Sequence, residues 1–203
     1  MMDGSVLWIP SLPLASVIAY LLGALPLGDQ ISRRQGVDIF SVGTGLAGAA
    51  NVRRCVGSVP GLLVLMGDMS KGALAILVGQ LVGIEGPWLL LLALSVVVGH
   101  WKPVFTRFRG GDGLAPLGGA MIVMFPVFGP ISVAVAMVVA LGGQFLPYPS
   151  LLNMVFGYGT LASLVIVYDG DYVRALGMGG VTGLVLAHAI LSPRGVEFDA
   201  LDR

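Results

Sequence analysis

Charge is scarce in this chain of 203 residues. Only 11% of the residues are Asp, Glu, Lys or Arg, whereas 56% are hydrophobic, and the formal net charge is zero. A soluble domain carries about 25% charged residues. Most soluble folds are therefore excluded, as are disordered chains and nucleic-acid binding through a basic surface. The composition fits a bundle of helices, each about 30 Å long, in a lipid bilayer.

Metal ligands and nucleophile motifs are also scarce. Cys55 is the single cysteine, and His100 and His188 are the only histidines. An intrachain disulfide and a thiolate metal site are thus excluded, and we expect neither a zinc site nor any other metal or cofactor. The sequence has no H-E-x-x-H, Walker A or G-x-S-x-G motif. Any reaction must therefore depend on positioning and on charge.

The N-terminal segment lacks the basic residues that begin a signal peptide. The first Lys or Arg is Arg33, and Asp3 is the single early charge. We therefore expect the first apolar run to be a retained transmembrane helix.

Long apolar runs dominate the rest of the chain. They cover residues 12–31, 59–83, 87–101, 114–129, 130–146, 151–167 and 175–192, with the fourth and fifth divided at Pro126 and Pro130. Lipid leaves no partner for free backbone groups, so these runs should be helices. We predict an all-α integral membrane protein of about seven transmembrane helices, formed as one polytopic domain over residues 1–203.

The few basic residues gather on one side of this arrangement. With the N-terminus outside, nine of the eleven basic residues fall inside: Arg33, Arg34, Arg53, Arg54, Lys102, Arg107, Arg109, Arg194 and Arg203. The positive-inside rule then predicts an external N-terminus and an internal C-terminus. Two glycine-rich segments, at about 32–58 and 102–113, face inward.

The first inward segment is a candidate anion site. It contains Gly43, Thr44, Gly45, Gly48 and Asn51, followed by Arg54. The glycines match a dinucleotide fingerprint, but that motif requires a preceding strand, which this helical chain cannot supply. Glycine turns still let successive N–H groups converge on an anion, to which an arginine adds charge. The alternative is a flexible turn between helices.

The second inward segment has a similar character. After His100, basic and aromatic residues alternate up to Arg109, and Gly110, Gly111 and Gly113 then lead into an apolar run. A helix N-terminus beside an arginine suits a phosphate. Ordinary positive charge near the lipid headgroups is the alternative. Two such segments on one face favour a shared ligand that carries phosphate.

Asp68 and Lys71 are charged residues inside an apolar run. Their spacing of three places them on one helix face. Intramembrane charges are usually paired or functional. An ion pair that fixes the helix register and a catalytic role both remain open, and we expect the two residues near mid-span, away from the inward segments.

These motifs resemble those of the PlsY family of bacterial membrane acyltransferases. The run A-Y-L-L-G-A-L-P-L-G at 19–28 resembles the family's A-Y-L-L-G-S-I-P-F-G, and D-M-S-K-G at 68–72 resembles D-L-L-K-G. Residues 43–54 resemble G-S-G-N-x-G-A-T-N-x-x-R, and residues 99–116 resemble G-H-x-F-P-x-F-x-x-F-K-G-G-K-G-V-A-T. The resemblance covers roughly residues 15–120 in the family's order.

The resemblance implies a function and a site. The enzyme would move an acyl group from acyl phosphate to glycerol 3-phosphate, giving lysophosphatidate, on the cytoplasmic face of a bacterial cell membrane. Its partners would be these two substrates and the lipid bilayer. His100, Arg54 and Arg109 would be catalytic. The substrate phosphates would be bound by Gly43, Thr44, Gly45, Gly48, Asn51, Arg54, Arg109, Gly110, Gly111 and Gly113. Asp68 and Lys71 would have a structural or coupling role.

The sequence departs from the family pattern at several positions of these motifs, among them Ala24 for Ser and Pro116 for Thr. Leu46 and Ala50 replace Asn and Thr, and Asp112 stands where the family has a second lysine. The third family motif, R-H-x-E-N-I-x-R-L, has two partial counterparts, residues 168–174 and His188. A catalytically impaired paralogue that binds lipid phosphate or a partner membrane enzyme is therefore an alternative. A small transporter is a further one, suggested by Asp68 and Lys71.

Overall fold

The computed structural model describes residues 11–142, 149–168 and 170–191, and all regular structure in these ranges is helical. The α-helices are α1 (Ser11–Ala24), α2 (Leu27–Arg34), α3 (Ala49–Cys55), α4 (Ser58–Leu81), α5 (Leu89–Trp101), α6 (Leu114–Met124), α7 (Phe128–Gly142), α8 (Pro149–Val167) and α9 (Tyr172–Leu191). Three short 3-10 helices, η2 (Ile39–Ser41), η3 (Gly86–Trp88) and η4 (Val104–Thr106), lie between them.

Each predicted apolar run contains a helix. Four stretches are long and apolar enough to cross a membrane, at Ser11–Arg34, Ser58–Leu81, Gly86–Thr106 and Tyr172–Leu191. The helices α6, α7 and α8 are apolar but shorter. The predicted class, an all-α membrane protein, is thus confirmed, whereas seven spans and an external N-terminus remain predictions.

Proline explains both the break that the sequence predicted and one that it did not. The division between the fourth and fifth runs is present, since α6 ends at Met124 and α7 begins at Phe128, on either side of Pro126. The expected continuous helix over 12–31 is instead divided into α1 and α2 at Leu25 and Pro26. Pro26 has no N–H to continue the helical ladder.

The two inward segments are more ordered than loops. The first was predicted as a glycine-rich loop over about 32–58, but it contains η2 and α3. Gly48 is the N-cap of α3, which begins at Ala49. Apolar burial of Ile39, Val52 and Val64 fixes this part of the chain against α4. Asn51, Arg53 and Arg54 therefore lie on a helix.

Many glycines in the spans allow helix backbones to approach closely. A Cβ added to Gly72 of α4 would lie 1.8 Å from the carbonyl oxygen of Pro116, and one on Gly119 of α6 would lie 1.8 Å from that of Met69. Gly23 of α1 likewise meets the backbone of α5. Such contacts are typical of membrane helices, which associate through small residues.

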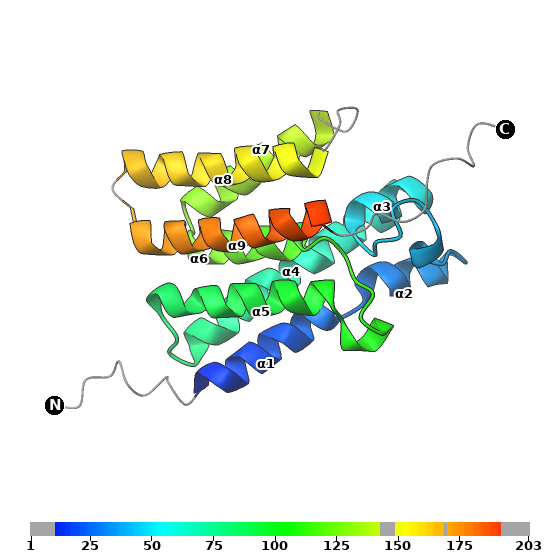
Figure 1. Ribbon diagram of the computed structural model, residues 1–203, viewed down its shortest axis with the longest axis horizontal. Helices are drawn as coiled ribbons and strands as arrows, with labels where there is room; N and C mark the ends of the chain where they lie inside the picture. Colours follow the sequence, from blue (N-terminus) through cyan, green and yellow to red (C-terminus); the bar gives the residue numbers. More distant parts are fainter. Residues whose placement is uncertain (1–10, 143–148, 169, 192–203) are drawn as a thin grey trace.

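Both inward segments lie at one end of the bundle (Figure 1), with α2, α3 and η4. The turn between α8 and α9 lies at the opposite end, next to the start of α5. The helices α7 and α8 form a pair on one side, and α1 lies on the other (Figure 1). This arrangement brings the two inward segments together at a single end.

Candidate functional site

A buried ion pair lies next to the break between α1 and α2. Lys71 Nζ lies 2.5 Å from Asp68 Oδ1, and the two side chains are only 4% and 2% exposed. The same Nζ donates to the carbonyl oxygen of Leu25 at 2.5 Å. The break at Pro26 leaves this carbonyl outside the helical ladder, so the lysine ammonium has a carboxylate and a backbone oxygen as partners.

His100, in the last turn of α5, joins this pair to the second inward segment. Its Nδ1 lies 3.8 Å from Asp68 Oδ1, which is an electrostatic contact rather than a hydrogen bond. On the other side, a Cβ added to Gly111 would lie 2.2 Å from His100 Nε2. Gly111 N also donates to His100 O at 3.1 Å. The imidazole is thus held between a carboxylate and a glycine turn.

The expectation that Asp68 and Lys71 lie away from the inward segments is wrong. Both residues line a small cavity together with His100, Arg109 and Gly110. The physical reason is that the backbone around Gly110 folds back onto the end of α5. A Cβ on Gly110 would lie 2.0 Å from His100 O, so only glycine permits this approach.

Asn51 organises the first inward segment. Its Oδ1 accepts a hydrogen bond from Thr44 N at 3.0 Å. Its Nδ2 lies within hydrogen-bond distance of the carbonyl oxygens of Ile39, Val42 and Leu46, at 3.3, 3.1 and 3.0 Å. Asn51 is only 3% exposed, and its side-chain amide is hydrogen-bonded to backbone groups of its own segment. These hydrogen bonds indicate that Asn51 stabilises the turn and does not itself contact a ligand.

Two glycines shape the turn that Asn51 holds. Gly43 and Gly45 have φ of 56° and 68°, in the left-handed region that favours glycine. A Cβ on Gly43 would also lie 2.1 Å from Asn51 Oδ1. The predicted glycine turn is therefore present, and Thr44 lies at its centre.

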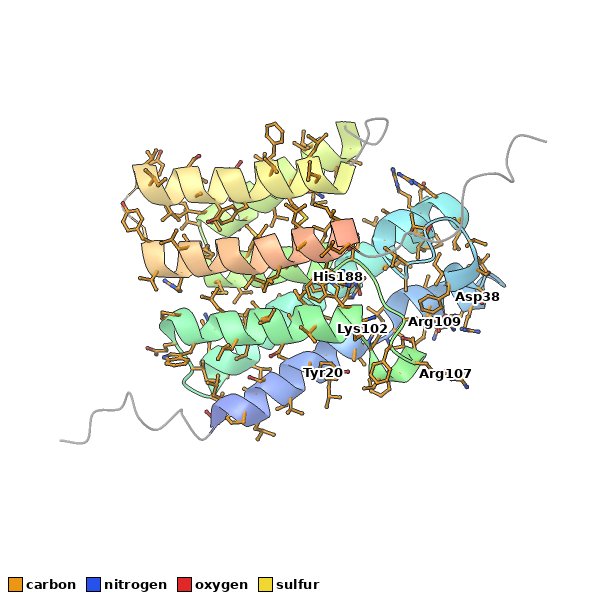
Figure 2. All side chains as sticks on the ribbon, viewed as in Figure 1. Tyr20, Asp38, Lys102, Arg107, Arg109 and His188 are labelled. Carbon is orange, nitrogen blue, oxygen red and sulfur yellow. The ribbon has the colours of Figure 1, made fainter. Side chains whose placement is uncertain are left out.

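The two inward segments contact each other directly. Ala47 N donates to Gly110 O at 3.1 Å. The Arg109 guanidinium lies 4.5 Å from the centroid of the Phe40 ring, which is a cation–π contact. Figure 2 shows Arg109 between α5 and η2. The two segments are thus in contact, and a shared ligand that carries phosphate remains a prediction.

Asp112 belongs to the second inward segment, two residues before α6 begins. Its Oδ1 accepts a hydrogen bond from Leu114 N at 3.1 Å, and its carbonyl oxygen accepts one from Trp101 Nε1 at 2.8 Å. A Cβ added to Gly48 would lie 3.9 Å from the carboxylate. The chain bends at Gly113, whose φ is 87°. The residue that replaces the family lysine thus faces the beginning of α3.

Of the two counterparts of the third motif, His188 is the one near the site. Its ring stacks on Trp101, with centroids 4.2 Å apart and an interplanar angle of 10°. Figure 2 places His188 beside the end of α5. The last turn of α9 thereby packs on the indole that holds the Asp112 carbonyl.

Of the other counterpart, residues 168–174, the structure describes residues 168 and 170–174, which lie at the far end of the bundle (Figure 1). There Asp171 caps α9, since its Oδ1 accepts a hydrogen bond from Arg174 N at 2.8 Å. This backbone hydrogen bond holds the pKa of Asp171 below its ordinary value. Asp171 and Arg174 therefore have a structural role at the start of α9.

A groove of roughly 370 Å³ opens beside the ion pair, within the size range of small-molecule sites. Its polar lining comes from Arg53, Ser58, Asp68, His100, Asp112 and Asn153, and most of its other walls are apolar or glycine: Gly48, Ala49, Ala50, Gly61, Leu62, Leu65, Leu114, Ala115, Met137, Ala140 and Leu141. It continues into a crevice between α4, α6, α7 and α8, since five residues line both.

Of two adjacent arginines in α3, only one lines the groove. Arg53 lines it, whereas Arg54, which matches the family motif, does not. Arg54 is exposed and lies three residues after Asn51, on the side of the helix that faces the glycine turn. The sequence indicated Arg54 rather than Arg53. The position of Arg53 depends on the packing of α3 against α4, where a Cβ added to Gly61 would lie 2.6 Å from Arg53 Cβ.

In the described ranges, no three His, Cys, Asp or Glu side chains gather in a way that could hold a metal ion. Asp68 and His100 are near each other, but Lys71 already neutralises the carboxylate. The chemistry available here is hydrogen bonding and charge from the side chains and from the glycine backbone.

The sequence model described as glycerol-3-phosphate acyltransferase matches residues 13–192. The chain belongs to this family. A glycerol-3-phosphate acyltransferase of Rubrobacter xylanophilus is 43% identical over 140 residues, which are 68% of each chain. One from Laribacter hongkongensis is 37% identical over 161 residues, which are 77% of this chain and 79% of that protein.

The fold agrees with the family assignment. The crystal structure of PlsY, an integral membrane glycerol 3-phosphate acyltransferase, in its glycerol 3-phosphate form matches with a TM-score of 0.74 and 29% identity. The match covers 93% of this chain and 96% of that one. The lysophosphatidic acid form of PlsY matches with a TM-score of 0.73. The predicted resemblance to PlsY is confirmed.

Proposed function

We propose that this member of the family transfers an acyl group from acyl phosphate to glycerol 3-phosphate, with the groove as the acyl donor site. The observation that carries the proposal is the shape of the groove. Its polar end contains Arg53, His100 and Asp112, and its apolar end continues between the helices. An acyl phosphate has a charged head and an apolar chain, and it matches this division.

The acyl chain would enter sideways from the bilayer. Leu62 of α4 and Leu141 of α7 line the groove and are 55% and 60% exposed, so the groove opens toward the surface that lipid covers. Deeper in the crevice, Met121 and Met154 supply flexible apolar walls. A substrate dissolved in the membrane therefore has a direct route to the polar end.

Glycerol 3-phosphate would bind on the other side of His100, at the two glycine turns. The backbone of the two glycine turns would shape this end of the site. Thr44 N, Ala47 N and Gly111 N already donate within the protein, so Arg54 and Arg109 would supply the positive charge for the phosphate. Asp68 and His100 line both the groove and the small cavity. They therefore lie where the two substrates would meet.

The reaction would need no covalent acyl-enzyme. The hydroxyl oxygen of glycerol 3-phosphate forms a bond to the acyl carbon, the bond from that carbon to the phosphate oxygen breaks, and inorganic phosphate leaves. The hydroxyl proton passes to a substrate phosphate oxygen. The protein contributes orientation of the hydroxyl and neutralisation of phosphate charge. His100 would donate a hydrogen bond or orient the second segment.

The proposed location is the cytoplasmic face of a bacterial cell membrane. Seven basic residues belong to the end of the bundle that holds the two inward segments: Arg33, Arg34, Arg53, Arg54, Lys102, Arg107 and Arg109. The positive-inside rule favours this end as the cytoplasmic one.

The direct test is an assay with purified, folded protein, a long-chain acyl phosphate and glycerol 3-phosphate. Lysophosphatidate and inorganic phosphate are expected in equal amounts. Folded protein that forms no product above a blank would refute the proposal. A parallel assay with long-chain acyl coenzyme A in place of acyl phosphate identifies the accepted acyl carrier. Product from acyl coenzyme A and none from acyl phosphate would refute acyl phosphate as the donor.

Adjacent arginines provide a test of the substrate assignment. We expect Arg54→Ala and Arg109→Ala to raise the KM for glycerol 3-phosphate, because both lie on the side of the glycine turns. Arg53→Ala is expected to raise the KM for acyl phosphate instead, because Arg53 lines the groove. Initial rates with each substrate varied in turn measure both constants. Equal effects of the three variants on both constants would contradict the division.

Asp112 keeps the impaired paralogue as a second candidate, because a carboxylate at the polar end of the groove repels a phosphate. Asp112→Lys reverses this charge and is expected to lower the KM for acyl phosphate several-fold, because Asp112 lines the groove. Asp112→Asn removes the charge and retains an oxygen for Leu114 N. Its KM should lie between the values of the wild type and of Asp112→Lys. A KM that rises in both variants would mean that the carboxylate assists binding in this chain.

A further inference from the structure

The segment that precedes the second glycine turn exposes apolar side chains outside the spanning helices. Val104, Phe105 and Phe108 are 44%, 58% and 58% exposed. Two of them lie in η4, which is a single turn, and the third lies two residues after it. Exposed leucines and valines on α4 or α9 face lipid because those helices span it, but this segment needs its own explanation.

The backbone directs these side chains outward. Arg107 and Phe108 have φ of 55° and 63°, the only positive values among non-glycine residues in the described ranges. Such strain persists only where the surroundings impose it. Here Phe108 N donates to Pro103 O at 2.9 Å, and Thr106 Oγ1 donates to Arg109 O at 2.5 Å. These two hydrogen bonds fix the turn in a conformation that leaves the rings of Phe105 and Phe108 exposed.

The segment lies beside a membrane helix rather than away from it. Tyr20 Oη donates to Lys102 O at 2.8 Å. Tyr20 belongs to α1, within the candidate span Ser11–Arg34. Figure 2 shows Lys102 near Tyr20 and Arg107 at the outer side of η4. The exposed rings are thereby held where the apolar part of α1 ends.

The charge within this segment has one sign. Lys102 and Arg107 are exposed. No acidic residue occurs between Glu85 and Asp112. A surface with phenylalanines flanked by cations complements the boundary of a bilayer that contains anionic lipid, where rings enter the acyl region and cations meet the headgroups.

We propose that residues 102–108 form an interfacial anchor that binds anionic phospholipid. Phe105 and Phe108 enter the boundary between headgroups and acyl chains, and Lys102 and Arg107 contact the lipid phosphates. Arg109, Gly110 and Gly111 follow directly, so the anchor fixes the second glycine turn at the depth of the bilayer surface. This inference concerns a lipid contact and does not depend on the acyltransferase assignment.

Depth-dependent fluorescence quenching tests the anchor without measuring activity. Phe105→Trp protein is reconstituted in vesicles of phosphatidylcholine and phosphatidylglycerol, with one or the other lipid brominated near the headgroup. The emission added by the new tryptophan should fall when phosphatidylglycerol is brominated, and fall less when phosphatidylcholine is brominated at the same mole fraction. Phe108→Trp should give the same order.

Two controls make the outcome decisive. Gln35→Trp adds a tryptophan at an exposed position after α2 and should show little quenching. Adding Lys102→Gln and Arg107→Gln to Phe105→Trp should remove the preference for phosphatidylglycerol. The proposal is overturned if Phe105→Trp is quenched no more than Gln35→Trp. It is also overturned if both lipids quench equally with the charges intact. Helical circular dichroism confirms that each variant is folded.

Discussion

Lys71→Met is expected to lower the free energy of unfolding by about 3–5 kcal/mol and to abolish acyl transfer. Removing one partner of a buried ion pair leaves the other charge uncompensated, and the cost has this magnitude. Asp68 is only 2% exposed at its side chain, so water cannot replace the lysine. The carbonyl of Leu25 would lose its ammonium donor as well. Equilibrium unfolding in mixed micelles measures the loss.

The double variant Asp68→Asn with Lys71→Met separates stability from function. With both charges gone, no uncompensated charge remains, and much of the lost free energy of unfolding should return. Activity should stay absent, because Asp68 and Lys71 line the cavity next to His100. If the double variant were as active as wild type, the pair would serve helix packing alone.

Gly111→Ala is expected to reduce kcat about 100-fold, the loss typical of a small displacement of a catalytic group. The new methyl group would lie 2.2 Å from His100 Nε2, so the imidazole has to move away from the position that Asp68 helps to fix. The fold should persist, since the clash involves the end of a side chain. Single-turnover rates measure the effect.

Gly159→Ala is the matched control for this substitution. Gly159 lies in α8, and a Cβ added there meets no atom within 4 Å. Alanine also favours a helix by up to about 1 kcal/mol over glycine, so this variant should be fully active and slightly more stable. A normal kcat for Gly111→Ala in the same assay would show that His100 tolerates displacement.

Much of this fold could be predicted from the sequence because the bilayer leaves few alternatives. Apolar runs in lipid must be helices, and each predicted run contains one, with the break at Pro126. The short helices α2 and α3 were not predicted. The glycine turns could be predicted too, because Gly43, Gly45 and Gly113 occupy left-handed backbone positions that few other residues accept. The family followed from the order and spacing of the motifs, and the family match confirms it.

The failures come from tertiary packing. Lys71 was expected at mid-span, but the break at Pro26 and the return of Gly110 onto His100 bring it to the site. Neither effect can be found by counting residues along a single helix. The position of Arg53 beside the groove depends in the same way on packing between helices, here of α3 against α4.

The hydrogen bonds of Asn51 have a consequence for ligand affinity. One amide side chain holds backbone groups from Ile39 to Leu46, so the conformational entropy of this stretch is lost when the protein folds. A ligand that binds the Gly43–Gly48 turn then meets a backbone that is already ordered, so little conformational entropy of the chain is lost on binding. A small, weakly held molecule such as a three-carbon phosphate gains most from a rigid receptor of this kind.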